Sequence, residues 1–500
     1  MSDLAISPSL PEFRTLAKRG NLIPLIADLV ADAETPVSAF AKIKSEEPCF
    51  LFESAEKNEA SGRFSFIGFD PILVFKNRGA TISMTENGHT RSFDTTTDPL
   101  HELQSVLARF QFVAPADIPH FVGGAVGFIG FDVVRYFEPT VPLHPRDDLK
   151  LPEMIFIIAR TVIVFDHRFR KLRVITHARV DNPARLEQAY ADAQQRLRDA
   201  IDQLRQPVAL PAVPAGPVGA LPRAESNTER KEFESMVCQA KELIAAGDVF
   251  QVVLSQRFEV KFDGNPLDLY RCLRFGNPSP YMFLLKLDPD FTAIGSSPEV
   301  HLRVNNGLAE IRPIAGTRPR GHDSAEDKRL AEELMADPKE RAEHVMLIDL
   351  GRNDLGRVAQ SGSIKVTEQM VIERYSHVMH IVSHVVGRLR DDRTAFDAMR
   401  ATFPAGTVSG APKVRAMQII GELEKSRRGF YSGVVGYFGF DGSLDSCIAL
   451  RSIVLRDGIA YLQTGAGIVA DSDPAREYDE TVNKAKAMLE AIGRAAQIKQ

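Results

Sequence analysis

The spacing of apolar residues divides the chain into a strand-rich first part and a second part in which helices and strands alternate. In the first part, the segments "RFSFIGF" (63–69), "MIFIIA" (154–159), "TVIVF" (161–165) and "KLRVIT" (171–176) are short and rich in β-branched and aromatic residues. Such segments are typical of β-strands. A charged run over 182–205 follows and is predicted to be helical. We therefore expect a mostly β N-terminal half.

The second part shows a clearer succession of hydrophobic periods. Apolar residues recur at helical spacing over 227–246, and Gly247 lies where a glycine commonly ends a helix. The pattern then alternates over 248–260, which predicts a strand. One helix and two strand regions are predicted next, at 266–275, 281–286 and 291–304.

A segment without charge separates the two parts. Residues 206–222, "QPVALPAVPAGPVGALP", are rich in proline, glycine and alanine, so they cannot continue a helix or pair in a central strand. At 500 residues the chain is also too long for one ordinary core. We therefore predict an N-terminal domain over 1–206, a connector over 207–222 and a C-terminal α+β domain over 223–496.

Composition and charge narrow the classes of function. The chain has 25% charged and 44% hydrophobic residues, as in globular proteins, and a net charge of −5, which argues against nucleic acid as the main partner. Its apolar stretches fall short of the about 18 uninterrupted residues expected of a membrane span. The N-terminus does not resemble a secretory signal. The four cysteines form no C-x-x-C pair, which favours a reduced, cytoplasmic protein.

Two predicted helices each carry two glutamates three residues apart on one face. "KERAEH" contains Glu340 and Glu343, and "DPAREYDETVNKA" contains Glu477 and Glu480. Like charges at this spacing repel each other and weaken an isolated helix. Four carboxylates without a nearby histidine or cysteine suit a hard, oxygen-preferring cation such as Mg²⁺.

Each pair also has an ordinary structural interpretation. Asp337 and Glu340 match the N-cap and N3 positions of a capping box. Glu480 could form an i,i+4 ion pair with Lys484. Glu343 has no capping role, and the apolar run after it predicts a buried helix, in which a carboxylate needs a partner. The residues by themselves leave metal binding and helix capping both open.

Several long motifs, taken in order, resemble one family. They are "RPIAGTRPRG" (312–321), "AEHVMLIDLGRNDLGRV" (342–358), "SHVMHIVS" (376–383), "TFPAGTVSGAPKVRAM" (402–417), "RRGFYSGVVGYFG" (427–439) and "QTGAGIVADSDPAREYDETVNKA" (463–485). Together they resemble the chorismate-utilising enzymes, and within them the members that form anthranilate. The resemblance implies an α+β fold of two intertwined domains, with antiparallel β-sheets packed face to face and helices on the outside. It also implies a regulatory N-terminal domain and a chorismate-binding catalytic C-terminal domain.

The resemblance further implies a metal and substrate site. The four glutamates would hold one Mg²⁺ ion that meets the ring carboxylate of chorismate, with Glu343 and Glu480 as direct ligands and Glu340 and Glu477 acting directly or through water. A divalent ion would reverse the negative sign of such a site. Substrate-binding residues would be Gly316, Thr317, Tyr431, Arg451, Gly465, Ala466, Gly467 and Lys484.

Two positions distinguish the reactions of the family. Members that use water as the nucleophile carry a basic lysine where this chain has Gln251, and a glutamine cannot take a proton from water. Members that aminate C4 commonly carry a nucleophilic lysine where this chain has Ala315, and alanine cannot form a covalent intermediate. Both positions favour amination of C2 followed by loss of pyruvate.

The implied catalytic residues are Glu299, His380, Thr407 and Gln251. Glu299 matches the family's general acid for the departing C4 hydroxyl, which requires a raised pKa. His380 matches the histidine associated with loss of the C2 hydrogen and the enolpyruvyl group. Taken alone, a histidine in an apolar context is more often structural.

The source of ammonia and the control of the reaction imply two partners. None of the four cysteines lies in the G-x-C-x-G context of a glutaminase nucleophile, so a separate glutaminase subunit is expected, in a heterotetramer of two large and two small subunits. "FLFESAE" (50–56) resembles the family segment that binds tryptophan as inhibitor. The implied inhibitor-binding residues are Ser54, Pro280, Tyr281 and Met282.

Two alternatives remain beside this expectation. The first is the large subunit of an aminodeoxychorismate synthase, which Ala315 disfavours. The second is a catalytically silent, tryptophan-sensing subunit that regulates a glutaminase. It would require the loss of a catalytic or metal-binding residue, and the glutamates, Glu299, His380 and Arg451 are all present.

Overall fold

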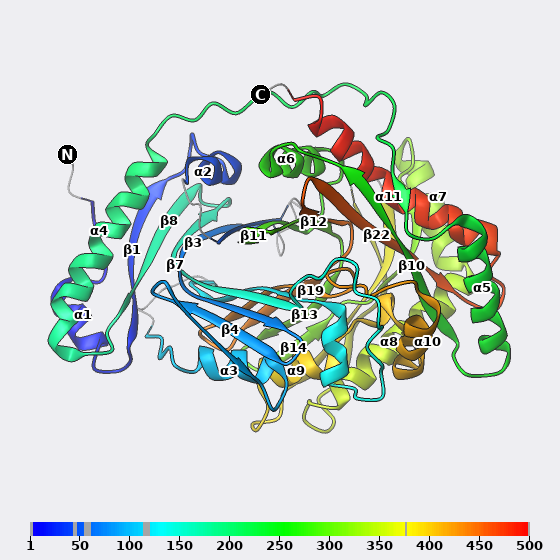
Figure 1. Ribbon diagram of the computed structural model, residues 1–500, viewed down its shortest axis with the longest axis horizontal. Helices are drawn as coiled ribbons and strands as arrows, with labels where there is room; N and C mark the ends of the chain where they lie inside the picture. The colour runs from blue at the N-terminus through cyan, green and yellow to red at the C-terminus, as the bar shows by residue number, and fades with distance from the viewer. Residues whose placement is uncertain (1–3, 44–47, 55–61, 114–120, 376–377, 499–500) are drawn as a thin grey trace.

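A computed structural model describes residues 4–43, 48–54, 62–113, 121–375 and 378–498 of the chain (Figure 1). Residues 55–56 and 376–377, at the ends of two of the motifs quoted above, lie outside the described residues. Within the described ranges, no helix combines the length and apolar character that a membrane span requires.

Several helices begin at a polar residue that caps their first turn. The side chains of Thr35, Asp98, Asp337 and Asp473 each accept a hydrogen bond from a backbone amide there. The α-helices of the described residues are α1 Leu10–Leu16, α2 Pro36–Lys42, α3 Pro99–Leu107, α4 Leu186–Leu204, α5 Arg230–Ala245, α6 Pro266–Gly276, α7 Ser324–Ala336, α8 Pro338–Gly356, α9 Ala395–Thr402, α10 Lys413–Leu423 and α11 Pro474–Ala495. The 3₁₀ helices are η1 Phe131–Tyr136, η2 Pro183–Arg185 and η3 Gly406–Val408.

The strands carry apolar residues on buried faces. In the N-terminal half they are β1 Leu22–Val30, β2 Cys49–Glu53, β3 Phe64–Arg78, β4 Thr81–Glu86, β5 His89–Asp94, β6 Gly124–Ile129, β7 Met154–Asp166 and β8 Lys171–Arg179. In the C-terminal half they are β9 Glu225–Ser226, β10 Gln251–Lys261, β11 Tyr281–Asp288, β12 Phe291–Ser297, β13 Val300–Asn305, β14 Leu308–Ile311, β15 Ile314–Pro319, β16 Lys365–Arg374, β17 Val378–Arg388, β18 Gly410–Ala411, β19 Val434–Gly439, β20 Leu444–Ile448, β21 Ser452–Arg456 and β22 Ile459–Ile468.

Antiparallel ladders join these strands across the two halves of the chain. Strand β2 pairs with β11, which brings Phe52 opposite Phe283, and β6 pairs with β19, which brings Val126 opposite Tyr437. Figure 1 shows the resulting arrangement, with the strands inside and most helices along the outside. The expected α+β fold with a large antiparallel sheet is confirmed, and the two halves share backbone hydrogen bonds.

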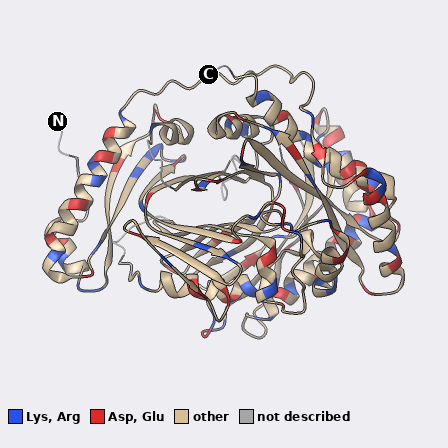
Figure 2. Ribbon diagram, in the orientation of Figure 1, with Lys and Arg blue, Asp and Glu red and all other residues tan. Residues whose placement is uncertain are grey.

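Amphipathic helices cover the sheets. Helix α4, for example, buries Tyr190, Leu197 and Ile201 while its other face is charged. Figure 2 shows basic and acidic residues intermixed along the outer helices, including α4 and α11. This interspersed pattern agrees with the small net charge of −5. Burial of one apolar stripe, rather than intrinsic propensity, supplies most of the stability of such helices.

Most predicted elements are present, with two differences in the strands. Helix α5 ends just before Gly247, which has a φ of +88°, as the sequence predicts. The strands predicted at 154–159 and 161–165 form one continuous strand, β7, through Arg160, which pairs with Asp70. The strand region predicted at 291–304 is interrupted between β12 and β13, at Pro298 and Glu299, because proline has no N–H group for a ladder.

The connector contains no helix or strand from residue 206 to residue 224. Arginine side chains of the C-terminal half hold it in place. The Arg271 Nη2 atom donates to the carbonyl oxygen of Pro211 at 2.8 Å, and Arg494 Nη1 donates to that of Gly216 at 2.8 Å. The connector therefore runs along α6 and α11 on the outside of the molecule (Figure 1).

Candidate functional site

The glutamates of α8 lie at the beginning of that helix. Asp337 caps it and Pro338 occupies its first turn, as predicted. The Glu340 side chain does not return to the cap. Its Oε1 atom accepts a hydrogen bond from Arg318 Nη1 at 3.2 Å, and a second branch of Arg318 pairs with Asp337 at 3.1 Å. Arg318 therefore positions Glu340. Arg318 was not singled out from the sequence, and the feature that could have indicated it is its place directly after the "AGT" of β15.

Glu343 lies one helical turn further along, facing strand β10. Gln251 at the start of that strand donates from Nε2 to Glu343 Oε1 at 3.1 Å. Burial raises the pKa of Glu343, and the charges of Glu340 and Glu480 act in the same direction, against the hydrogen bond from Gln251. Gln251 therefore touches a predicted metal ligand and cannot serve as a base.

The second pair of glutamates lies at the beginning of α11. Burial raises the pKa of Glu477, and the charge of Glu480 adds to this effect. Glu480 forms the i,i+4 ion pair with Lys484 at 2.7 Å, and Lys484 Nζ also donates to the Gly465 carbonyl at 2.9 Å. An ion pair of 3.0 Å between Lys339 and Asp471 links the beginnings of α8 and α11. The first turns of the two helices therefore lie near each other.

The carboxylates match a hard-cation site in chemistry, although their side chains do not converge. Within the described residues, no group of three or more His, Cys, Asp or Glu side chains lies close enough together to hold a metal ion. Burial is the largest cause of the raised pKa values of Glu343 and Glu477, repulsion by neighbouring glutamates adds to it, and the Lys484 charge opposes both. A divalent cation ligated by carboxylates would relieve this repulsion, so the donor set fits Mg²⁺.

Tyr431 provides a buried hydroxyl next to Gly465 of β22, and Arg451 provides a mostly buried guanidinium beside Asn277. The described residues place no carboxylate against Arg451; its Nη1 atom lies 3.4 Å from Asn277 Oδ1, and burial lowers its pKa. Burial raises the pKa of Tyr431 to about 12, so its hydroxyl stays protonated and can donate. A buried guanidinium without an acidic partner is costly, so the site is suited to an anionic ligand.

Glycines on one face of β22 make room for these groups. A Cβ atom at Gly465 would lie 2.9 Å from the Tyr431 hydroxyl, and one at Gly467 would lie 2.7 Å from Gln251 Nε2. Ala466 between them faces the opposite way and belongs to the core. The G-A-G pattern therefore has a local steric reason, and it brings the β22 backbone close to a ligand.

Glu299 occupies the interruption between β12 and β13, where it is buried. The Thr407 hydroxyl donates to Glu299 Oε1 at 2.8 Å. Burial raises the pKa of Glu299 to about 8, against the opposing effects of the Thr407 hydrogen bond and the Lys484 charge. Glu299 is therefore largely protonated at neutral pH, which the role of general acid requires.

His380 lies on β17 opposite Thr317 of β15, beside the register shift at Gly316. Its Nδ1 atom is 2.8 Å from the Gly316 carbonyl oxygen and 3.1 Å from the Thr317 hydroxyl. Burial lowers the pKa of His380, and the charge of Arg451 adds to this effect, while the hydrogen bond to Gly316 opposes it. The imidazole is therefore neutral at neutral pH. The Lys484 charge lowers the pKa of both Glu299 and Glu343, against the larger effect of burial, so Lys484 influences the general-acid candidate and a predicted metal ligand alike.

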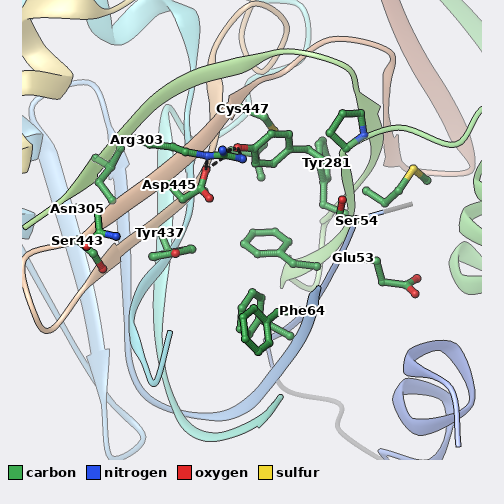
Figure 3. Close-up of a pocket in the computed structure, with 18 of the residues that line it drawn as sticks. Glu53, Ser54, Phe64, Tyr281, Arg303, Asn305, Tyr437, Ser443, Asp445 and Cys447 are labelled. Atoms are coloured by element: carbon green, nitrogen blue, oxygen red, sulfur yellow. Dashed lines mark hydrogen bonds and ion pairs between the residues drawn. The ribbon is translucent and has the colours of Figure 1, made fainter. Parts of the chain in front are cut away.

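A separate cavity of about 530 Å³ is lined by residues of the paired strands β2, from the N-terminal half, and β11, from the C-terminal half (Figure 3). Ser54, Pro280, Tyr281 and Met282 all line it. The Ser54 hydroxyl is buried and has no hydrogen-bond partner among the described residues. The Tyr281 hydroxyl donates to Asp445 at 2.6 Å, and Arg303 donates to the same hydroxyl. The four predicted inhibitor-binding residues are thus brought together, apart from the glutamates.

Comparisons with known proteins agree with one family along the whole chain. The family model described as chorismate binding enzyme matches residues 47–490. Anthranilate synthase component 1 of Aquifex aeolicus is 48% identical over 487 residues, covering 97% of each chain. The protein of the same name from Acetivibrio thermocellus is 45% identical over 497 residues, covering 98% of this chain and 99% of its own.

Solved structures agree with the fold. Anthranilate synthase component I of Streptococcus pneumoniae superimposes with a TM-score of 0.73 at 37% identity, covering 92% of this chain and 99% of the other. The menaquinone-specific isochorismate synthase of Escherichia coli gives a TM-score of 0.71 at 20% identity, covering 97% and 98%. The second likeness shows a shared fold.

Proposed function

Because the chain belongs to the chorismate binding enzyme family, we propose that it converts chorismate and ammonia to anthranilate, pyruvate and water. This reaction is the first step of tryptophan synthesis. The relatives named anthranilate synthase component 1 support the proposal. The observation that carries the proposal is the buried carboxyl of Glu299, with a pKa of about 8, held by Thr407 beside Lys484. An acid that is still protonated at neutral pH is what the departure of the C4 hydroxyl needs.

Chorismate is bound through its two carboxylates. Arg451 and the Tyr431 hydroxyl are mostly buried donors without an acidic hydrogen-bond partner among the described residues, and the Tyr431 hydroxyl lies beside Gly465. One substrate carboxylate replaces the missing counter-ion of Arg451, which offsets the cost of burying that charge. The ring carboxylate is directed toward the glutamates of α8 and α11.

The other carboxylate requires a cation between it and those glutamates. Mg²⁺ would be held by Glu343 and Glu480, with Glu340 and Glu477 binding directly or through water. It supplies positive charge that neutralises the ring carboxylate and fixes its position. Gln251 and Arg318 hold Glu343 and Glu340 by hydrogen bonds of 3.1 and 3.2 Å, so the protein positions two of these four carboxylates in advance.

The chemical steps use Glu299 and His380 in turn. Free ammonia forms a bond to C2 of the ring while the C4 hydroxyl leaves as water with the proton of Glu299. His380 then removes the hydrogen from C2. Electrons of that C–H bond make the ring aromatic as the C3–O bond breaks, and the enolpyruvyl group leaves to become pyruvate. Atoms balance, since chorismate and ammonia give anthranilate, pyruvate and water.

The nature of residues 251 and 315 supports an ammonia-dependent reaction at C2. Gln251 is engaged with Glu343 and has no basic group to activate water. Ala315 lies on β15 opposite Ile381 and offers no amine for a covalent intermediate. The component 1 name of the relatives implies a component 2, so ammonia is supplied by a glutaminase subunit, in a heterotetramer of two large and two small subunits. The four free cysteines agree with a reducing, cytoplasmic location.

Feedback control is assigned to the cavity at Ser54. An unpartnered hydroxyl suits the ammonium or carboxylate of an amino acid, and Met282 with the aromatic side chains of the wall suits an indole ring. L-Tryptophan, the end product, is therefore the proposed inhibitor. Its site lies where strands of both halves pair, so binding there can alter how the halves pack.

Incubating the chain with chorismate, MgCl₂ and an ammonium salt tests the proposal. Anthranilate should appear by fluorescence together with an equal amount of pyruvate. Formation of a 4-amino product without pyruvate would favour an aminodeoxychorismate synthase. Consumption of no chorismate would leave only a tryptophan-sensing role.

A further inference from the structure

We propose that Arg428 and Glu424 are positioning residues for the reaction: their buried ion pair holds the Thr407 loop, strand β10 and Tyr431 in place around the substrate. This inference rests on the function proposed above and adds two residues to it. Neither residue belongs to the predicted catalytic, metal or substrate-binding set. Glu424 is the C-cap residue of α10, and Arg428 lies four residues further on, in the motif that also contains Tyr431.

The ion pair is almost completely buried and has bidentate geometry. The exposed fraction of the side chain is 1% for Arg428 and 4% for Glu424. Arg428 Nε donates to Glu424 Oε2 at 2.9 Å, and Nη2 donates to Oε1 at 2.6 Å. Parallel bonds of this kind fix the direction of the guanidinium plane as well as its distance.

The remaining N–H groups of Arg428 reach two backbone segments of the site. Nη1 donates to the Val408 carbonyl at 2.7 Å and lies 3.3 Å from the Ser432 hydroxyl. Nη2 also donates to the Val253 carbonyl at 2.8 Å. All five guanidinium donors are therefore engaged, and lysine, with three donors on one atom, cannot reproduce them.

Each of these segments carries a residue that binds a predicted catalytic or metal-binding glutamate. Val408 directly follows Thr407, whose hydroxyl binds Glu299. Val253 lies two residues after Gln251, which holds Glu343, and it pairs with Gly467 in the β10–β22 ladder. A shift of Arg428 would therefore displace both the hydrogen bond to the general acid and one side of the anion-binding glycines.

Glu424 extends the same network to the pair two positions further along that ladder. Its Oε1 atom accepts hydrogen bonds from the Ser255 amide at 2.9 Å and the Ser255 hydroxyl at 2.7 Å. Ser255 lies opposite Gly465, beside which the Tyr431 hydroxyl is placed. The Arg428 guanidinium also lies 5.6 Å from the centre of the Tyr431 ring. Arg428 thus lies near the Tyr431 ring, and Glu424 binds the strand residue opposite Gly465.

The N-terminal half closes the network from outside. The Arg428 guanidinium lies 4.7 Å from the centre of the Phe131 ring. The Phe131 amide donates to the Gly429 carbonyl at 2.8 Å, and the Gly429 amide donates to Asp132 Oδ2 at 2.9 Å. Arg428 therefore lies where strand β10, the loop that contains Thr407 and the N-terminal half meet.

Stability alone is a weak reason for this arrangement. Desolvation makes a buried ion pair no better for stability than well-packed apolar residues, whereas breaking one by removing a partner is costly. This pair also binds the carbonyls of Val408 and Val253 and the amide of Ser255. It therefore fixes the positions of these backbone segments, which apolar packing without hydrogen bonds cannot do.

The experiment measures kcat and the KM for chorismate of R428K, E424Q, T407V and the R428K/T407V double variant, with Mg²⁺ and a fixed concentration of free ammonia at each pH. R428K should lower kcat at least 10-fold and raise KM for chorismate. The hydrogen bond from Thr407 lowers the pKa of Glu299. Loss of Thr407 in T407V, or its displacement in R428K, should therefore raise that pKa and move the alkaline limb of the kcat profile to higher pH. The double variant should lose less than the product of the two single losses.

R271K is the matched control, because Arg271 also pairs with an acid, Asp268, and a backbone carbonyl but lies on α6. It should leave kcat, KM and the pH limb unchanged. If R428K does not fold by circular dichroism, E424Q keeps the shape and should show the same shift of the limb. The inference would be overturned if, in the variants that fold, the losses of kcat multiply and the alkaline limb of the kcat profile stays where it is in wild type. Turnover by wild type would still uphold the proposed function in that case. Absence of anthranilate formation by wild type would overturn both.

Discussion

The Nδ1 atom of His380 lies 2.8 Å from the carbonyl oxygen of Gly316. A carbonyl can only accept, so the neutral imidazole carries its proton on Nδ1 and leaves the lone pair of Nε2 free to take a proton. Gly316 reaches this position with a φ of +66°, in the left-handed region that favours glycine. A backbone contact thus decides which nitrogen of His380 is available for the proposed role of base.

Replacing His380 with asparagine should separate these two nitrogens. The asparagine amide can still donate to Gly316, but it has no counterpart of Nε2. We expect kcat to fall by about 10²–10⁴-fold, as for loss of a general base, with little change in the KM for chorismate. The aminated intermediate that still carries its enolpyruvyl group should accumulate and be visible by chromatography. H384N, on the same strand, is the control, and an H380N enzyme with normal pyruvate release would refute the assignment.

The raised pKa of Glu299 makes a prediction about stability as well as activity. The carboxyl has a pKa of about 8 in the folded protein but an ordinary pKa of about 4.5 when the chain is unfolded. Its contribution to stability is therefore present at low pH and is lost progressively as pH rises from about 4.5 to 8. E299Q, which cannot ionise, should be inactive, and its midpoint of thermal unfolding should exceed that of wild type by more at pH 8 than at pH 5.5.

The control for this measurement is E332Q, since Glu332 is an exposed residue of α7. Its unfolding midpoint should follow that of wild type at both pH values. An E299Q midpoint that tracks wild type in parallel across the range would mean that Glu299 ionises normally. Retained turnover in E299Q would remove it from the role of general acid.

The metal prediction concerns Glu343 and Glu480. Chelation should abolish anthranilate formation and added Mg²⁺ should restore it. In wild type, Mg²⁺ should raise the midpoint of thermal unfolding, because a ligand that binds only the folded state stabilises it. Neither effect should occur in E343Q or E480Q, because a neutral amide is a poor ligand for a hard cation. E490Q, also on α11, should behave as wild type; full activity of wild type in excess chelator would contradict the prediction.

The nitrogen source can be tested with the isolated chain. It should use ammonium salts and ignore glutamine. At a fixed total ammonium concentration the rate should first rise with pH, because only the free amine attacks. The alkaline fall set by Glu299 should emerge once rates are compared at constant free ammonia. Glutamine-dependent anthranilate formation by the purified single chain would show that it carries its own glutaminase.

The cavity at Ser54 permits a direct binding measurement, because the chain contains no tryptophan. The fluorescence anisotropy of added L-tryptophan then reports binding without background from the protein's own indoles. S54F should fill the cavity and remove both binding and inhibition while leaving uninhibited turnover near that of wild type. S92F, on the exposed strand β5, is the control.

Tryptophan and chorismate should also oppose each other equally. With Mg²⁺ present and ammonia omitted, chorismate should weaken tryptophan binding by the factor by which tryptophan weakens chorismate binding, and a coupling of about 1–3 kcal/mol is the usual range. Normal tryptophan binding by S54F, or unequal factors in wild type, would refute this site or its reciprocal coupling.

Local chemistry was readable from the sequence because it depends on near neighbours. The cap at Asp337, the end of α5 at Gly247 and the ion pair between Glu480 and Lys484 all follow from spacing along one helix. The motif resemblance in turn singled out Glu299, His380 and the glutamates. The interruption of the strand region at Pro298 could also have been anticipated, since proline cannot donate to a ladder.

Only the tertiary structure decided which of these groups meet. Arg318 binds Glu340 and Arg428 binds Glu424, Val253 and Val408, through contacts whose partners are as far as 175 residues apart in the chain. The pairing of β2 with β11 closes the cavity at Ser54 from two halves of the sequence. The raised pKa of Glu299 and the lowered pKa of His380 have burial as their largest cause. Burial is a property of the packed core and not of any local pattern. The sequence therefore predicts which residues are the candidate acid and base, while the fold sets the pKa values that these roles require at neutral pH.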